Sequence, residues 1–182
     1  MILTPKILAR LVVLVLLAVL LQVTFFSRVA LFHVSPDVLP AVIVSLGLLG
    51  GSMTGAVSGF SAGILLDCLL IAPLGGSSLV LLSCGYLAGL FRERFEVTSP
   101  FLPPLMIALF TLFAELGFGA VELMLGVDST VSALVIKDML IKSVFAFFLG
   151  WPIYVGIKRL LRPAIVEEPE RRRSRRPTVL GA

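Results

Sequence analysis

Three carboxylates interrupt otherwise apolar stretches of this sequence: Asp67, Glu115 and Glu122. A charged side chain at bilayer depth costs about 2.5–3.5 kcal/mol on insertion scales, so each acid needs a compensating role. Glu115 and Glu122 are spaced to lie two helical turns apart on one face. Such a pair of acids can form an ion or proton path. The same pair can bind Lys137 or Lys142 from the next apolar run, and we favour this structural pairing over transport.

Glycines recur every four residues ahead of the first acid, in the segment GLLGGSMTGAVSGFSAGILLDCLLIAPLGG, residues 47–76. A four-residue step is about 400° on a helix, so Gly55, Gly59 and Gly63 line one groove. Burial from water does not hold helices together inside a membrane, whereas close van der Waals approach does, and it needs small residues. The spacing therefore predicts the most tightly packed helix of the bundle. A packing face without a further role is the favoured interpretation.

Asp67 continues the glycine face towards the outer end of that helix. It can pair with a donor at depth, reach the aqueous interface, or accept hydrogen bonds from the amides of the turn that follows. Pro73 ends the helix, and Gly75 and Gly76 supply a permissive backbone for the turn. Acceptance of hydrogen bonds from the turn amides would be a structural role for Asp67.

Composition places these residues in a membrane. The chain is 58% hydrophobic and 14% charged, against about 45–50% apolar in soluble domains. Its mean hydropathy is +1.09. Long uncharged stretches predict an all-α integral membrane protein with a six-transmembrane-helix bundle. We expect one membrane domain, residues 1–162, followed by a disordered basic cytoplasmic tail, residues 163–182. The expected spans are about 7–27, 37–51, 54–71, 76–92, 101–126 and 134–161.

Basic residues set the expected orientation. With both termini in the cytoplasm, the outer loops contain only Arg28. The cytoplasmic segments then contain Lys6, Arg10, Arg92, Arg94, Lys158, Arg159, Arg162 and the five tail arginines. The first run starts like a signal peptide but lacks a small-residue cleavage site, so we expect a retained helix. The sequence thus predicts a multi-pass membrane protein with both termini in the cytoplasm.

Residue types needed for catalysis or metal binding are scarce. The chain has one histidine, His33, and two cysteines, Cys68 and Cys84, which fall in apolar runs as packing residues. It contains no nucleophile elbow, phosphate loop or HExxH motif. We therefore expect no enzyme activity, metal or cofactor. The tail arginines favour contact with anionic lipids, and nothing beside them supports nucleic-acid binding.

A family resemblance rests on two stretches, SPDVLPAVIVSLGLLGG and GAVSGFSAGILLDCLLIAPLGGSSLVLLSCGYLAGL. In order and spacing, their motifs resemble those of the rod shape-determining protein MreD family. The resemblance covers about residues 1–160, with its specific part at 36–90, and excludes the basic tail. Its motifs are Pro36–Asp37, Gly59–Phe60 through Gly63 to Asp67, Pro73–Leu74–Gly75, and Gly85–Tyr86 with Gly89. We expect turn or buried polar roles for Pro36, Asp37, Asp67, Pro73, Leu74, Gly75, Tyr86 and Gly89.

The resemblance implies a non-catalytic membrane protein of the bacterial cell-elongation machinery. Such a protein acts with MreC, a single-span protein with an extracytoplasmic coiled coil. It also acts indirectly with the actin-like MreB and with the wall-synthesising glycosyltransferase and transpeptidase. A scaffold of this kind would pack the MreC-like span against Gly55, Gly59 and Gly63.

The family is also similar in fold to the substrate-binding subunits of energy-coupling-factor vitamin transporters, which supplies the alternative of a small-molecule-binding transporter subunit. That subunit would use Asp67, Glu115 or Glu122 as polar contacts. The chain has no Asn, one Gln, one Trp and two Tyr, so it has few side chains that could orient a polar ligand by hydrogen bonds. We therefore favour the scaffold.

Overall fold

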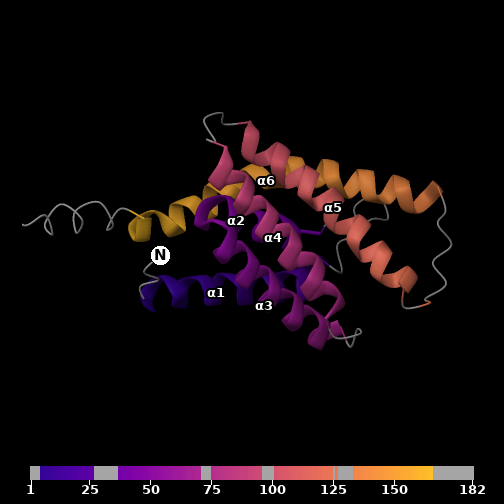
Figure 1. Ribbon diagram of the computed structural model, residues 1–182, viewed down its shortest axis with the longest axis horizontal. Coiled ribbons are helices and arrows are strands. Elements are labelled where there is room, and N and C mark those ends of the chain that lie inside the picture. The colour runs from indigo at the N-terminus through magenta and orange to yellow at the C-terminus, as the bar shows by residue number, and fades with distance from the viewer. Residues whose placement is uncertain are drawn as a thin grey trace, which may run out of the picture.

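The architecture is a bundle of helices (Figure 1). A computed structural model describes residues 5–26, 37–70, 75–95, 101–124, 126 and 133–165. Within these residues there are six α-helices and no strand, so the predicted all-α, six-helix class is confirmed. A π-helical turn, Gln22–Phe26, extends the first helix. The α-helices are α1 Pro5–Leu21, α2 Leu39–Gly50, α3 Ser52–Leu70, α4 Gly76–Arg94, α5 Leu102–Met124 and α6 Ala133–Ile165.

Membrane-crossing length and hydropathy are met by three segments of the described chain, Ser52–Leu70, Leu102–Val121 and Lys137–Leu161. Shorter apolar helical segments run over Ala9–Thr24 and Leu39–Gly50. Together these helices mark an integral membrane protein. The exposed faces of α1, α5 and α6 are rich in Leu, Val and Phe, as lipid contact requires.

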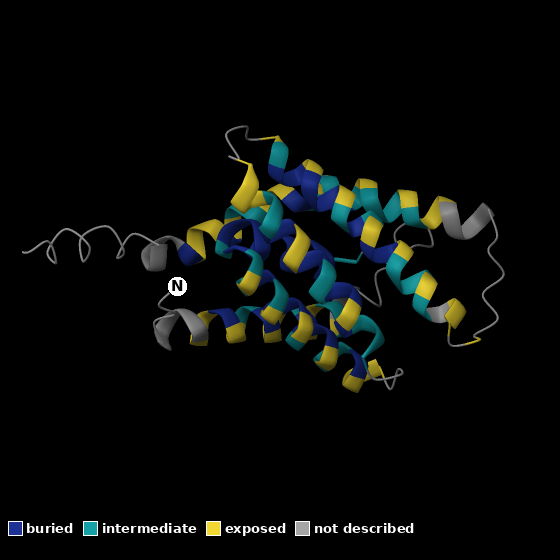
Figure 2. Cartoon of the chain, in the orientation of Figure 1, coloured by how far each residue is buried: buried dark blue, intermediate teal, exposed yellow. Residues whose placement is uncertain are grey.

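The short helix α2 lies in the centre of the bundle. Its residues from Leu39 to Leu49 are all buried, and it is dark blue along most of its length (Figure 2). It contacts each of the other five α-helices. A helix that is apolar all round belongs in a core. At 12 residues it is only about 18 Å long, so it depends on its neighbours rather than on lipid.

Glycines join α3 to α4, the most extensive helix pair in the described chain. A Cβ on Gly59 would overlap the Leu81 carbonyl group of α4, and a Cβ on Gly55 would overlap the Gly85 carbonyl group. Gly63 meets the backbone of Ser78 in the same way. The regular glycine spacing therefore serves a contact within the chain. Since α4 occupies this face, these glycines are not free to receive a partner helix.

The helical conformation is interrupted between α2 and α3 at Gly51, which has a φ of 89°. The break falls at the boundary between the two expected spans, 37–51 and 54–71. Two charged residues at the end of α4 hold both helix ends. Arg92 donates to the Leu49 carbonyl at the end of α2, and Glu93 accepts from the Ser52 amide, at 2.8 Å, at the start of α3. Each charge is complementary to the dipole of the helix end that it contacts.

Several expectations fall outside the described residues. These are the motif residues Pro36, Pro73 and Leu74, the Glu122 side chain, and the tail beyond Ile165. The backbone of Glu122 continues α5.

Candidate functional site

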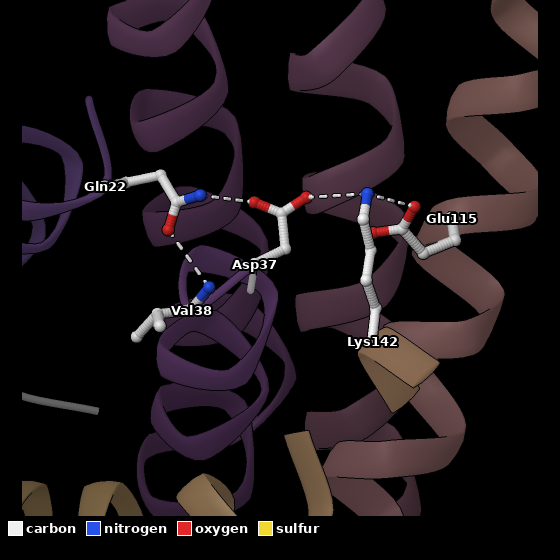
Figure 3. A network of polar contacts seen from close by, with 5 residues as sticks. All are labelled: Gln22, Asp37, Val38, Glu115 and Lys142. Atoms are coloured by element: carbon white, nitrogen blue, oxygen red, sulfur yellow. Dashed lines mark hydrogen bonds and ion pairs between the residues drawn. The ribbon is translucent and has the colours of Figure 1, made fainter. Parts of the chain in front are cut away.

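A polar network links four helices inside the bundle (Figure 3). It joins Gln22, in the turn that extends α1, to Asp37, two residues before the start of α2. Lys142 of α6 then lies between Asp37 and Glu115 of α5. These residues are far apart in the sequence and come from separate helices. The network therefore fixes how the helices sit relative to one another.

Gln22 secures the start of α2. Its Nε2 donates to Asp37 Oδ1 at 2.5 Å, and its Oε1 accepts from the Val38 amide at 3.0 Å. The first amides of a helix lack partners within the helix, and Val38 makes no side-chain cap of its own. Gln22 therefore supplies the missing acceptor from another helix. Asp37 also adds a negative charge at the positive end of α2.

Lys142 is shared between two carboxylates. Its Nζ lies 2.8 Å from Glu115 Oε2 and 3.9 Å from Asp37 Oδ2. The Glu115 side chain is only 7% exposed, against 23% for Lys142 and 26% for Asp37. The predicted pairing of Glu115 with Lys142 is thus confirmed. A buried carboxylate is tolerated when it is paired and hydrogen-bonded, and the ammonium group makes both contacts with Oε2, whereas Oε1 has no hydrogen-bond partner among the described residues.

The space beside this network is small. A pocket lined by Asp37, Ala41, Lys142 and Phe145 has a volume of about 10 Å³. That volume admits about one water molecule. Binding sites for small organic ligands are about 300–1,000 Å³. This pocket has room to hydrate the 3.9 Å gap between Asp37 and Lys142, and it has no room for a vitamin.

Asp67 has a structural contact near the C-terminal end of α3. Its Oδ2 accepts from the Gly75 amide at 2.8 Å, which is one of the three roles considered for it from the sequence. Gly75 has a φ of 105°, which favours glycine, and it caps α4 without a side-chain hydrogen bond. Asp67 is 1% exposed, so it does not reach the aqueous interface. It acts as a helix cap supplied from the neighbouring helix.

Two motif residues of α4 differ in placement. Gly89 is buried, and a Cβ there would overlap the backbone of Ser52. Tyr86 was expected to be a buried polar residue, but it is 44% exposed. The reason is helical geometry: one residue is a 100° rotation, so with Gly85 turned towards α3, Tyr86 turns away from the core.

Sequence reasoning did not single out Gln22, Arg92 or Glu93 as structural contacts. Gln22 carried a usable signal, because it is the chain's only amide side chain and ends an apolar run. Within the described residues, no group of three or more His, Cys, Asp and Glu side chains is placed to hold a metal ion.

The comparisons with known proteins give a family assignment. The sequence model for the rod shape-determining protein MreD matches residues 5–160. No curated protein and no solved structure matches the chain, so the expected similarity to vitamin-transporter subunits is not shown. The matched range includes α1 to α5, α6 as far as residue 160, and every residue of the polar network. The chain belongs to the family of the rod shape-determining protein MreD.

Proposed function

We propose that this protein is a non-catalytic scaffold of the rod-shape machinery in the bacterial cell membrane. It packs against the transmembrane helix of an MreC-like single-span protein. Through that partner it couples an MreB-like cytoskeleton to the glycosyltransferase and transpeptidase that build the wall. Family membership supports the rod-shape role, and the partners follow from what such a role requires.

The observation that supports the proposal is that the intramembrane charged side chains contact other helices of the same chain. Lys142 contacts both Asp37 and Glu115, and Asp67 caps α4. These contacts bind helices of the same chain to one another. The pocket at the network is about the size of a water molecule. Such charges stabilise a fixed bundle, which is what a scaffold needs to present a constant surface to partners.

The proposed orientation places both termini in the cytoplasm. Arg92 and Arg94 end α4, and Lys158 and Arg159 lie near the end of α6. Both ends would then face the cytoplasm, in agreement with the positive-inside rule. The network of Gln22, Asp37, Glu115 and Lys142 would lie in the outer half of the membrane. We propose that the basic tail beyond α6 contacts anionic lipid.

The experiment that tests this role removes the charges as a pair. The double variant Glu115→Gln/Lys142→Met replaces the ion pair with neutral side chains of similar length. We would express it in rod-shaped cells depleted of the native protein and measure cell shape and partner co-purification. A scaffold should retain both, provided that the variant accumulates in the membrane at the native level.

A folded double variant that loses rod shape would overturn the proposal, because the charges would then have a role beyond holding the bundle. Recovery of a transport ATPase or a tightly bound vitamin with the native protein would also overturn it. The matched control is Lys137→Met, which removes an exposed lysine from the same helix.

A further inference from the structure

The polar network contains more acid than base. Asp37 and Glu115 both lie beside the ammonium group of Lys142 (Figure 3). Gln22, the fourth side chain, is uncharged. With both carboxyl groups ionised, the network would therefore carry an excess negative charge inside the bundle. A buried charge without a compensating partner is unfavourable, so this arrangement calls for a second positive charge.

No described residue supplies that positive charge. The charged groups that act on Glu115 are the two other charged members of the network. On α6, Lys137 is exposed, and Asp138, an exposed acid one turn before Lys142, adds a negative charge. α2 contains no ionisable side chain, and the charged residues of α4 lie in its last turn. Cys84 of α4, which donates to a carbonyl of α5, is an uncharged thiol.

Two oxygen atoms of the acids also lack a hydrogen-bond donor. Lys142 donates to Glu115 Oε2 at 2.8 Å, whereas Glu115 Oε1 is buried and has no partner among the described residues. Asp37 Oδ2 lies 3.9 Å from the Lys142 Nζ, which is beyond hydrogen-bond distance. The two acids are near enough for a side-chain hydrogen bond, and the free Glu115 oxygen points towards the Asp37 side of the network (Figure 3). Such a bond requires a proton, because a carboxylate has no donor.

We propose that Asp37 and Glu115 form a proton-binding site, in which one proton is shared between Asp37 Oδ2 and Glu115 Oε1. The proton gives each of these oxygens a hydrogen-bond partner. It leaves a single negative charge on the pair, and Lys142 balances that charge. Because acids that share a site titrate as a pair, the negative charge belongs to both residues. This inference goes beyond the scaffold role and does not depend on it.

A metal cation would supply the same charge, but the site does not suit one. Hard metal cations take about six or more oxygen ligands. Within the described residues, no three His, Cys, Asp or Glu side chains are grouped to hold an ion, and the Lys142 ammonium group already lies between the acids (Figure 3). The adjoining pocket, of about 10 Å³, admits about one water molecule. A proton needs no further space, and Asp37, the more exposed acid, gives it access to water.

The shared proton makes the bundle sensitive to pH. An unfolded chain does not hold this proton at neutral pH, because an ordinary carboxyl group ionises in the acid range. The folded state therefore binds one more proton than the unfolded state, and stability falls as pH rises until the shared proton is released. One proton changes the unfolding equilibrium constant about tenfold per pH unit. Above that range, repulsion between the two carboxylates would weaken the contact between the start of α2 and α5.

Infrared difference spectroscopy tests for the proton directly. The full chain in lipid vesicles should show the carbonyl stretch of a protonated carboxylic acid at neutral pH, and the band should vanish at alkaline pH. Asp37→Asn and Glu115→Gln should each abolish the band, because the remaining acid is balanced by Lys142 alone. Asp138→Asn, which removes an exposed acid nearby, should retain it. A native chain without the band, or a band that survives in a folded Asp37→Asn or Glu115→Gln variant, would overturn the inference.

The pH dependence of unfolding in lipid–detergent micelles gives a second readout. From neutral pH upward, the unfolding equilibrium constant of the native chain should rise by about tenfold per pH unit relative to that of Glu115→Gln. His33, the chain's one histidine, is present in both proteins, so the comparison cancels its titration. Parallel curves for the two proteins would refute the shared proton. Neither experiment uses a partner protein, so such a failure would leave the proposed function standing.

Discussion

Removal of Lys142 is the perturbation that the structure predicts most sharply. In Lys142→Met, Glu115 stays buried with a carboxylate that has lost its only described ion pair. Asp37 loses its contact with the same ammonium group. The apolar part of the side chain is conserved, so packing in the bundle changes little. The variant therefore isolates the effect of the charge.

The size of the effect follows from the distances. At an effective dielectric constant of about 20, opposite charges 2.8 Å apart attract by about 6 kcal/mol, and charges 3.9 Å apart by about 4 kcal/mol. Much of this attraction is offset by the cost of desolvating the native pair. Removal of one member of a buried ion pair costs about 3–5 kcal/mol. We expect the free energy of unfolding to fall by that amount in Lys142→Met.

The assay is reversible unfolding in lipid–detergent micelles, followed by the fluorescence of Trp151, the chain's one tryptophan. Adding Glu115→Gln to Lys142→Met should restore about 2–3 kcal/mol, because no unpaired buried carboxylate then remains at position 115. Lys137→Met, the exposed control on the same helix, should change stability by less than about 0.5 kcal/mol. If Lys142→Met and Lys137→Met have equal stabilities, the network does not hold the bundle and the reasoning fails.

Three further predictions concern the helix contacts. Gly59→Leu should prevent the bundle from folding, since the leucine side chain would overlap the α4 backbone. The control Gly156→Leu places its side chain in open space and should fold normally. Limited proteolysis compares the folding of the two variants. Asp67→Ala should lower the free energy of unfolding by about 0.5–2 kcal/mol through loss of the turn cap, whereas wild-type stability in the unfolding assay would exclude that role. Hydrogen bonds from the Ser52 amide and hydroxyl lower the pKa of Glu93. The ionised Glu93 carboxylate therefore stabilises the folded state at any pH above the ordinary carboxyl pKa. This stabilisation is lost as pH falls through the folded-state pKa. Glu93→Gln should therefore flatten the acid limb of a stability–pH curve, and an unaltered limb would contradict this.

Hydropathy alone was enough to predict the helices, because a membrane leaves few alternatives for a long uncharged segment. The predicted spans agree with the helix bounds within a few residues at most ends. Local chemistry was also readable. The contact of Asp67 with the following turn was among the three roles considered for it. Lys142 was one of two lysines at a depth that suited Glu115.

Which helices contact each other could not be predicted from the sequence in the same way. Gly55, Gly59 and Gly63 show that some helix comes close, but their spacing does not specify which one, and the answer is α4. The contact of Gln22 with Asp37 depends on how the ends of α1 and α2 meet, which neither helix specifies. Tyr86 was expected to have a turn or buried polar role because it belongs to the Gly85–Tyr86 motif of the family resemblance. Its outward direction depends on the rotation that packs Gly85 against α3.

The most direct test of the scaffold is native mass spectrometry of the protein released from its own membranes together with whatever remains bound. The account predicts a complex with a single-span, coiled-coil protein and no bound small molecule other than lipid. A mass that matches this chain with a transport ATPase, or with a tightly held vitamin, would contradict the account.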